Sequence, residues 1–579
     1  VHSLEVTSVT QPPVGDPSGS DTTAQPEHVE SEPPPKKKGG FRFPTALTVL
    51  FLILGLVWVA AFFIPSGVYE RTPEGDPIPG SYTEIAKCEQ GVETESTPVR
   101  SIDRTPSGEP CIDKSVQTMF QMLWIAPPNG LYGIEDEFGS VSSGNTGSLY
   151  GSAEIFLFVL VVGAFITITM RTGAVTAGIT RLALRFKHSP RMLIIILMVV
   201  FALGGTAYGM WEETLGFYVL LVALVLAMGF DRMVGAGIIF VGAGTGIIAS
   251  TVNPFATGVA SDAAGIAISE GLVLRVIMWL VLVPVGILYV LWYAKRVEQD
   301  PAKSVVGLDP DEAVEEIEDA PKLTGRQKGI LAVFLGTFVI MVYGFIPWTD
   351  IWQALFDADY PLPQMADILG DFYFTEASVL FLVSAVLIGL IGKMGEKGTV
   401  EAITAGAADF LGAALVIVVA RSITVVMKNT YIIDTVLDWM EGIVSGTSSM
   451  VFAQLAFLVN IPIAFLVPSS SGHAALVMPI LAPLADFAGV ARDLVVTGYQ
   501  SASGLVNLIT PTSAVLMGGL ALSKIGYDKY IKFILPYMAI VFVLIIIFIG
   551  LGVVVGGEVE PVAEAAPVVS PTPEASPAA

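Results

Sequence analysis

Long apolar runs without charged residues constrain this chain more than any other feature. The run from Phe533 to Gly557 contains no Asp, Glu, Lys or Arg, and Val276 to Ala294 is also uncharged. A helix needs about 20 apolar residues to cross the hydrocarbon core of a bilayer. Only 14% of the residues are charged, whereas a typical soluble protein has about 25%. The sequence therefore predicts an all-α polytopic membrane protein with roughly 10–12 transmembrane segments.

Basic residues at the ends of the apolar runs indicate the orientation of the chain. Lys36, Lys37, Lys38 and Arg42 precede the first run, and Lys295 follows the run that starts at Val276. Positively charged loops stay in the cytoplasm. We therefore expect a multi-pass protein of a bacterial inner membrane with its N-terminus in the cytoplasm and its C-terminus outside. The first run is longer than the apolar part of a signal peptide, so we interpret it as a retained anchor.

Polar interruptions of the apolar runs recur at a common spacing of 257 residues, as between Glu213 and Ser470. The stretch 174–187 is basic, whereas its counterpart 431–444 is acidic. Opposite charge at corresponding positions indicates opposite orientations in the membrane. We therefore predict two inverted repeats, each with a re-entrant hairpin and a broken helix. This arrangement is typical of secondary transporters.

The apolar runs, polar loops and repeats divide the chain into eight segments. We expect a disordered cytoplasmic tail over 1–41, a first transmembrane helix over 42–65, an extracytoplasmic region over 66–152, a first repeat over 153–295, an acidic cytoplasmic linker over 296–327, connecting transmembrane helices over 328–408, a second repeat over 409–557 and a disordered tail over 558–579. The two cysteines, Cys88 and Cys111, both fall in the extracytoplasmic region. An oxidising compartment permits a disulfide between them, and two free thiols are the alternative.

Two of the interruptions are predicted to form the tips of the re-entrant hairpins. Their candidate substrate-binding residues are Glu212, Glu213 and Thr214 in the first and Ser469, Ser470, Ser471 and His473 in the second. An ionisable residue at membrane depth is costly and indicates function by default. We therefore expect the substrate site where the two tips meet. The alternatives are a surface loop with two solvated glutamates and a histidine with a structural role.

The other two interruptions predict broken helices. Asn253 precedes a proline, and Asn507, Thr510 and Thr512 surround another. A proline in a helix leaves a carbonyl of the preceding turn free, and such oxygens suit a hard cation. We expect a sodium ion near Ser250, Asn253, Ser503 and Asn507, or else a proton, as the coupling ion. Packing between helices through small polar residues is the alternative.

One cation, Arg421, stands inside an apolar run. It binds a substrate carboxylate, or neutralises an internal acid such as Glu213, or extends to the membrane surface near Lys428. The sequence leaves these three alternatives open.

Four segments carry a resemblance to a known family: GGTAYGMWEETLGFY, ASTVNPFATGVAS, PSSSGHAALVMPILAPLAD and YQSASGLVNLITPTSAVLMG. They resemble the YfcC family of membrane carriers, which groups with anaerobic C4-dicarboxylate carriers and arginine/ornithine antiporters in the ion transporter superfamily. The resemblance covers residues 42–556. It implies a fold similar to sodium-coupled dicarboxylate carriers, an elevator-type motion and a homodimer. Those carriers have Ser-Asn-Thr at the hairpin tips, whereas this chain has Glu-Glu-Thr and Ser-Ser-Ser.

These features favour an ion-coupled secondary transporter, working by symport or antiport, over an enzyme. Two glutamates at the first hairpin, together with one intramembrane cation, suit an amino acid, basic ones included, and a C4-dicarboxylate is the alternative. An ion channel is the alternative from another class, although no charged ring or filter repeat appears. PSSSGH also resembles a motif of membrane lipid phosphatases, but no second histidine is placed to act with His473. The net charge of −23 argues against a nucleic-acid partner, so we expect a small-molecule substrate and the lipid bilayer as partners and no cofactor beyond the coupling ion.

Overall fold

The computed structural model describes residues 45–556 apart from short gaps. The gaps are 73–75, 89–101, 105–109, 137–138, 187, 308–321, 347, 350–351, 353–362, 364–367, 371, 445 and 468. Both predicted tails and residues 308–321 of the acidic linker therefore lie outside the described residues.

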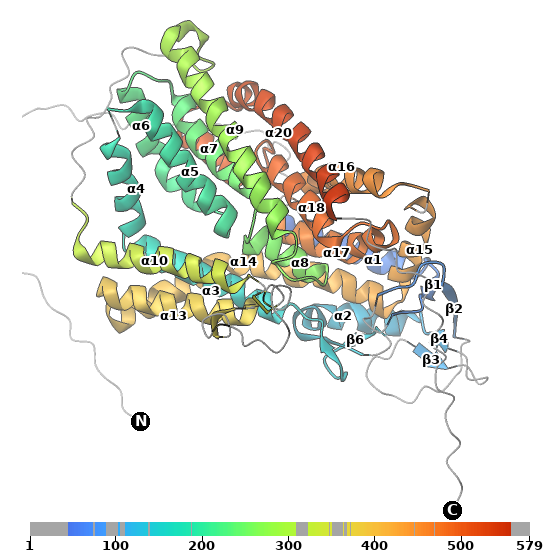
Figure 1. Cartoon of the computed structure of the whole chain (residues 1–579). Helices are drawn as coiled ribbons and strands as arrows, with labels where there is room; N and C mark the ends of the chain where they lie inside the picture. Colours follow the sequence, from blue (N-terminus) through green and yellow to red (C-terminus); the bar gives the residue numbers. More distant parts are fainter. Residues whose placement is uncertain are drawn as a thin grey trace, which may run out of the picture. The chain divides into compact units, whose positions relative to one another are not determined.

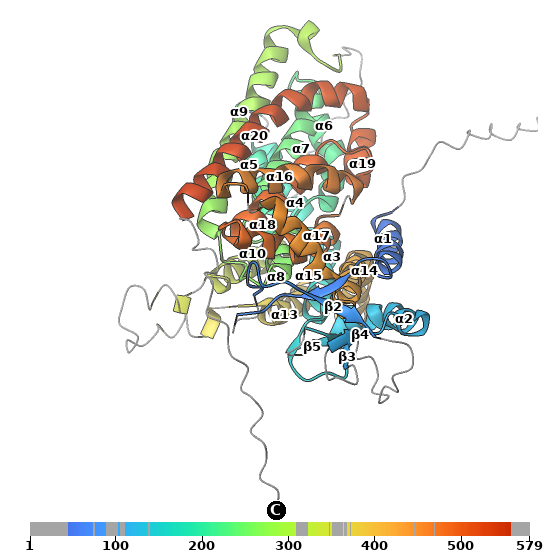
Figure 2. The same ribbon diagram turned by 90° about the vertical axis from the view of Figure 1, so that its right-hand side faces the viewer.

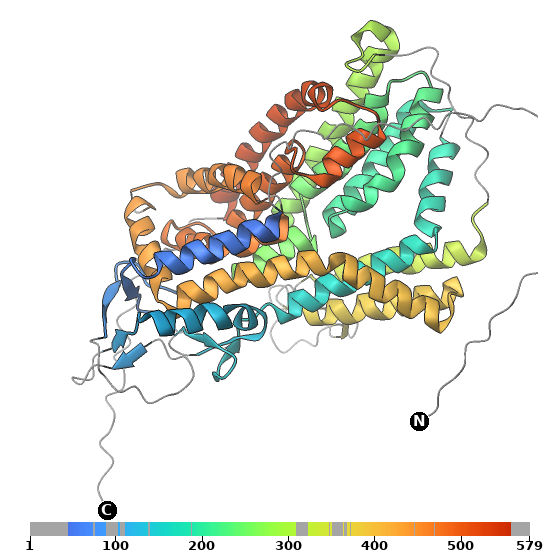
Figure 3. The same ribbon diagram turned by 180° about the vertical axis from the view of Figure 1, so that it is seen from behind.

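The prediction of a polytopic helical membrane protein is confirmed. Eight of the described helices are long and apolar enough to cross a membrane: α3 (Ala153–Arg171), α5 (Pro190–Tyr208), α9 (Leu272–Gln299), α10 (Gly325–Gly344), α13 (Phe374–Gly392), α14 (Gly395–Asn429), α16 (Ser449–Leu466) and α20 (Tyr527–Gly556). Two shorter apolar helices are α1 (Ala46–Ala60) and α7 (Arg232–Ile248). The long helices α3 and α14 lie side by side (Figures 1 and 3), and α1 packs along α14 (Figure 3).

The long helices of the two repeats follow one another in a corresponding order. The first repeat begins with α3, α4 (Ala174–Arg185) and α5. These are followed by η1 (Glu212–Phe217), α6 (Tyr218–Ala227), α7, η2 (Pro254–Gly258), α8 (Val259–Ala263) and α9. In the second repeat, the end of α14 is followed by α15 (Ile432–Val444), α16, α17 (Ser470–Phe487), α18 (Arg492–Asn507), α19 (Ala514–Leu522) and α20. The short η3 (Pro301–Lys303) follows α9, between the repeats.

Corresponding helices of the two repeats run in opposite directions where they touch. Gly244 of α7 lies against Leu508, whereas Ile248, one turn later, lies against Gly504 of α18. The helices α7 and α18 are therefore antiparallel. The same reversal relates α9 to α20, through the contacts Gly286–Tyr537 and Tyr293–Phe533. The predicted inversion of the repeats is confirmed by these contacts.

Each repeat contains one hairpin and one interrupted helix. The first hairpin is α5 followed by η1 and α6, and the second is α16 followed by α17. The first interrupted helix breaks between α7 and η2, where Asn253 caps the new helical turn by accepting from the amide of Phe255 at 2.9 Å. The second breaks between α18 and α19, where Ser513 accepts from the amide of Leu516 at 3.3 Å. Asn and Ser are favoured N-caps because their side-chain oxygens satisfy free amides.

Residues 66–149 add strands that the sequence did not predict. One sheet has the order β1-β2-β4-β3, from β1 (Ser66–Val68), β2 (Thr83–Lys87), β3 (Ile102–Arg104) and β4 (Pro110–Ile112). The other has the order β6-β5-β7, from β5 (Ile134–Glu135), β6 (Val141–Ser142) and β7 (Ser148–Leu149). Helix α2 (Val116–Tyr132) stands between the sheets in the chain, and Figure 2 shows the strands gathered beside it.

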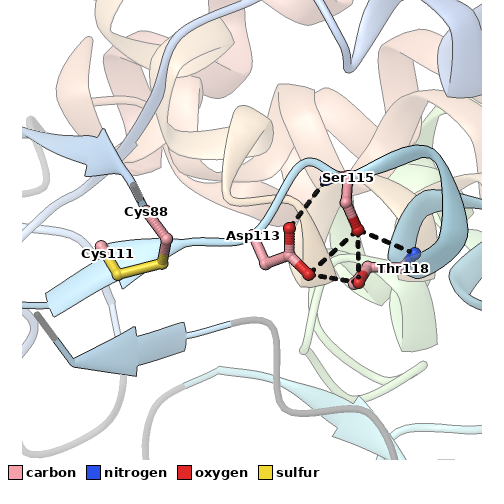
Figure 4. The surroundings of a disulfide bond; sticks show 5 residues. All are labelled: Cys88, Cys111, Asp113, Ser115 and Thr118. Carbon is pink, nitrogen blue, oxygen red and sulfur yellow. Dashed lines mark hydrogen bonds between the residues drawn. A yellow bond between two sulfur atoms is a disulfide. The ribbon is translucent and has the colours of Figure 1, made fainter. Parts of the chain in front are cut away.

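A disulfide joins Cys88, just after β2, to Cys111 in β4 (Figure 4). Beyond it, Asp113 and Ser115 form the cap of α2, in which the Thr118 amide donates to Ser115 Oγ at 3.3 Å. The disulfide thus closes the sheet next to the start of this helix.

The acidic helix α15 holds the first sheet in place. Ser66 Oγ donates to the carbonyl of Thr430 at 2.7 Å, and the hydroxyl of Tyr69 donates to Glu441 Oε2 at 2.6 Å. Arg71 forms an ion pair with Asp434 at 3.0 Å. Two of the acids that distinguish 431–444 from its basic counterpart therefore bind residues of the 66–88 region.

Candidate functional site

The tip of the first hairpin is compact and carries an acid with one unpartnered oxygen. Helix α5 ends at Gly209, whose φ of 74° turns the chain toward η1. Thr214 is buried, and its hydroxyl donates to the carbonyl of Trp211 at 2.5 Å. The side chain of Glu212 is exposed, whereas Oε2 of Glu213 is buried and has no hydrogen-bond partner among the described residues. Glu213 therefore has unused capacity to accept a hydrogen bond.

This first tip rests on both broken helices. A Cβ at Gly209 would stand 2.8 Å from Nδ2 of Asn253, so the tip backbone touches the first break directly. Near the end of α5, Thr206 Oγ1 donates to the carbonyl of Ala249 at 3.0 Å. Trp211 Nε1 donates to Ser513 Oγ at 3.5 Å, which joins the tip to the second break.

The tip of the second hairpin is rich in hydroxyls and packs on α18. Ser469 caps α17 and accepts from the amide of Gly472 at 3.3 Å. Ser503 Oγ donates to Ser470 Oγ at 3.3 Å, and the hydroxyl of Tyr499 donates to the carbonyl of Ser470. Ser471 is buried beside them.

His473 stands one turn into α17 and is fully buried. Its ring meets that of Tyr499 edge-on, with centroids 4.8 Å apart. Neither ring nitrogen has a hydrogen-bond partner among the described residues. Because a buried polar group without a partner costs free energy, His473 is a second group at the tips with unused hydrogen-bonding capacity.

Gln500 of α18 connects the two broken helices, and the sequence did not predict this role. Its Nε2 donates to the carbonyl of Ser250 at 2.7 Å, and its Oε1 accepts from Thr257 Oγ1 at 2.7 Å. Ser250 and Thr257 also share a hydrogen bond of 2.8 Å. One amide side chain of α18 therefore fixes both sides of the first break. The available signal was an amide inside the uncharged stretch Leu494–Ser523.

The hydrogen bonds of the described residues join each tip to the broken helices and not to the other tip. The predicted site residues therefore group around the crossing of α7 and α18. The carbonyl of Ser250 accepts from Gln500, Ser503 bonds to Ser470 of the second tip, and Asn253 uses its oxygen to cap η2. Asn507 ends α18 half-buried, and the hydroxyls of Thr510 and Thr512 bond each other at 2.7 Å. These bonds do not gather the four predicted sodium ligands into one cluster.

Arg421 is paired with an acid of the first repeat. Its Nη2 donates to Oδ2 of Asp262 in α8, and its guanidinium lies 5.1 Å from the centre of the Tyr150 ring. The partner is thus an internal acid, but Asp262 and not the Glu213 that the sequence suggested. The sequence did not predict this partner, and the available signal was that Asp262 is the first charged residue after the uncharged stretch Met233–Ser261.

Comparisons with known proteins agree with this architecture. The chain matches the family described as DcuC, C4-dicarboxylate anaerobic carrier, over residues 43–554. An uncharacterized protein of Haemophilus influenzae is 31% identical over 523 residues, which cover 86% of this chain and 95% of the relative. The putative basic amino acid antiporter YfcC of Escherichia coli is 29% identical over 405 residues, which cover 69% of this chain and 77% of the relative.

Two solved structures share the fold. The YdaH transporter of Alcanivorax borkumensis aligns with a TM-score of 0.61 at 13% identity and covers 89% of this chain and 100% of its own. MtrF of Neisseria gonorrhoeae, described within a class of antimetabolite efflux pumps, aligns with a TM-score of 0.61 at 17% identity and covers 89% of this chain and 96% of its own. With a family match that spans nearly all of the described residues, the chain belongs to the DcuC family and is a multi-pass membrane transporter.

Proposed function

We propose that the chain carries amino acids, basic ones included, in an ion-coupled symport or an antiport. The observation that carries this proposal is the uneven chemistry of the two hairpin tips. The first offers a buried carboxylate oxygen of Glu213 without a partner, and the second offers the ring nitrogens of His473. A carboxylate accepts hydrogen bonds from an ammonium or guanidinium group. The N-terminus of α17, with its serine hydroxyls, favours a carboxylate. An amino acid carries both kinds of group.

The state of Arg421 also supports an amino acid over a dicarboxylate. Two substrate carboxylates need cationic or amide-rich surroundings. The cation expected for that role is bound to Asp262, and the first tip carries two glutamates. The name of the Escherichia coli relative, a putative basic amino acid antiporter, points the same way. The description of the family as C4-dicarboxylate carriers keeps a dicarboxylate as the second candidate.

The remaining features of the proposal follow from the sequence. A bacterial inner membrane with the N-terminus in the cytoplasm accounts for the basic residues that flank the first apolar run. A proton or sodium ion is the coupling ion, and the oxygens around Ser250 and Gln500 are its candidate ligands. We propose a homodimer on the family resemblance.

Uptake by purified protein in liposomes tests the proposal. Labelled arginine, ornithine and succinate are each offered under a sodium gradient, under a proton gradient, and against the same unlabelled compound inside. We expect saturable arginine or ornithine uptake that is stimulated by internal substrate. Uptake of succinate alone would replace the amino acid by a dicarboxylate. Flux that does not saturate and shows no counterflow would indicate a channel.

A further inference from the structure

Asp409 of α14 is a further acid in the membrane part of the chain, and it belongs to neither hairpin tip. Asp409 is the one charged residue of α14 between Glu401 and Arg421. Its side chain is exposed, and it forms no hydrogen bond or ion pair with any described residue. Unlike Arg421, Asp409 is therefore neither covered nor neutralised by neighbouring side chains of the described chain.

The packing of α14 on α3 gives the depth of Asp409. The next residue, Phe410, lies against Gly163, where a Cβ would stand 2.5 Å from its ring. Gly163 is near the middle of α3, which is 19 residues long and apolar enough to cross a membrane. At about 1.5 Å of rise per residue, Asp409 is some 20 Å from the start of α14. Its packing neighbour on α3 therefore places Asp409 inside a hydrocarbon core about 30 Å thick, at about the depth of the middle of α3.

An ionised carboxylate at this depth is costly in hydrocarbon, and such residues in membrane helices typically face other protein groups or a water-filled cavity. Its neighbours on the helix are consistent with water. Glu401, Thr404, Ala408 and Gly412 are exposed at spacings of three or four residues, and a Cβ on Gly412 would meet nothing within 4 Å. We call these four residues and Asp409 the α14 stripe. The exposed Leu411 and Leu415 flank it.

The stripe has one open end and one closed end. It begins at Glu401, after the exposed residues 395–397 at the start of α14, and beyond Leu415 every residue from Val416 to Met427 is buried. Val416 touches Gly472, the residue before His473 with its two unpartnered ring nitrogens. The ion pair of Arg421 with Asp262 covers the helix further on. The exposed face therefore leads from the Lys393 end to the second hairpin tip and stops there.

We propose that the α14 stripe lines a water-filled path from the Lys393 end of α14 to the second hairpin tip, and that Asp409 is a site in this path for the cationic group of the transported substrate. An ammonium or guanidinium group that passes a carboxylate at mid-depth is stabilised where the bilayer otherwise repels it. The identity of this ligand rests on the proposed function, whereas the path itself does not.

Cysteine labelling tests the path without reference to the substrate. Both native cysteines are joined in the disulfide, so an introduced cysteine is the one free thiol of the chain. Asp409→Cys and Gly412→Cys are treated with a charged, membrane-impermeant methanethiosulfonate from each side of sealed vesicles. Val383→Cys is the control, because Val383 is exposed in the middle of the apolar helix α13.

We expect both α14 variants to react from one side only, the side of Lys393, and the control from neither. If the α14 variants are as unreactive as Val383→Cys, the path is wrong. Crosslinking of Asp409→Cys between two copies of the chain in the membrane would place this face at a subunit interface and would also refute the path.

Substitution of Asp409 tests the cationic site. We expect Asp409→Asn to raise the KM for arginine about fivefold, the size of a water-exposed ion pair, and Asp409→Glu to restore most of the affinity. Saturating arginine should slow labelling of Gly412→Cys. An unchanged KM in Asp409→Asn overturns the cationic site. If the unmodified protein transports succinate and no amino acid, the proposed function fails together with the cationic site, while the labelling still decides the path.

Discussion

Arg421 in α14 donates a hydrogen bond from Nη2 to Oδ2 of Asp262, and this ion pair ties α14 to the short helix that follows the first break. The side chains of the two residues are 8% and 20% exposed, respectively. The other carboxylate oxygen of Asp262 accepts from the hydroxyl of Tyr373 at 3.0 Å, just before α13. The first broken helix is thus held to α13 and α14 through one carboxylate.

Removal of one partner of this pair leaves a charge buried without its counter-charge. We expect Arg421→Gln to lower the free energy of unfolding by about 3–5 kcal/mol, because the carboxylate of Asp262 remains. The double variant Arg421→Gln with Asp262→Asn should lose less than Arg421→Gln alone. Unfolding in detergent, followed by tryptophan fluorescence, measures the free energy of unfolding of the unmodified protein, the single variant and the double variant. Equal losses in the single and double variants would show that the two side chains do not stabilise each other.

The two glutamates of the first tip provide a test of function, in which substitution of Glu212 is the control for substitution of Glu213. We expect Glu213→Gln to abolish transport or its ion coupling, because it removes a charged acceptor whose Oε2 is buried without a partner. Glu212→Gln changes an exposed side chain and should keep most of the uptake. Counterflow in liposomes measures both, and thermal unfolding checks that both fold. Normal kinetics in Glu213→Gln would remove this residue from the mechanism.

Gly209 is expected to tolerate no side chain. Its φ of 74° costs an L-residue about 1–2 kcal/mol, and a Cβ would stand 2.8 Å from Asn253. Gly209→Ala should therefore displace the tip from the first break and lower transport more than it lowers the amount of folded protein. Gly216→Ala is the control, because φ there is negative and nothing lies within 4 Å of a Cβ. Similar uptake by the two variants would contradict the close contact of tip and break.

Lys114, between β4 and α2, is expected to react at an unusually low pH. Burial, and to a smaller extent Lys87, lowers the pKa of Lys114 to about 8, and its Nζ donates to the carbonyl of Ile64 at 2.6 Å. A lowered pKa means that the amine loses its proton as the pH rises through about 8, where an ordinary lysine of pKa about 10.4 stays charged. Since the neutral amine is the nucleophile, acylation of Lys114 should rise to half its maximum near pH 8. Peptide mass spectrometry after brief acetylation at pH 7 to 11 measures this midpoint, and a midpoint above pH 10 would exclude the shift.

The sequence predicted those parts of the fold that the bilayer dictates. Backbone polar groups must be paired in hydrocarbon, so uncharged runs have to be helices and polar interruptions have to be turns or breaks. For this reason the spacing between Glu213 and Ser470 located both hairpin tips. The strands around Cys88 and Cys111 carried no such constraint. They are two to five residues long, too short for an alternating pattern, and partners such as Thr430 are remote in the chain.

Composition indicated candidate site residues, but it did not indicate which side chains pair with one another. Arg421 was recognised as a cation that needs a partner, but Asp262 is 159 residues away, on the short helix that follows the π-helical turn at Pro254. Gln500 was missed because an amide carries no charge and its two partners are in the other repeat. Asp409 was missed because its role depends on which face of α14 is uncovered, and packing alone decides that.

The hydrogen bond between Ser66 and Thr430 sets an order of events during synthesis. The two residues are 364 positions apart, and at roughly 5–20 residues per second the second emerges on the order of 20–70 s after the first. Cys88 and Cys111 are separated by only 23 positions. The sheet is therefore able to close on itself while the ribosome is still producing the membrane helices, and its attachment to α15 comes late in biogenesis. Until then the newly made strand β1 has no acidic helix to bind, so this surface is completed only after α14 and α15 have been synthesised.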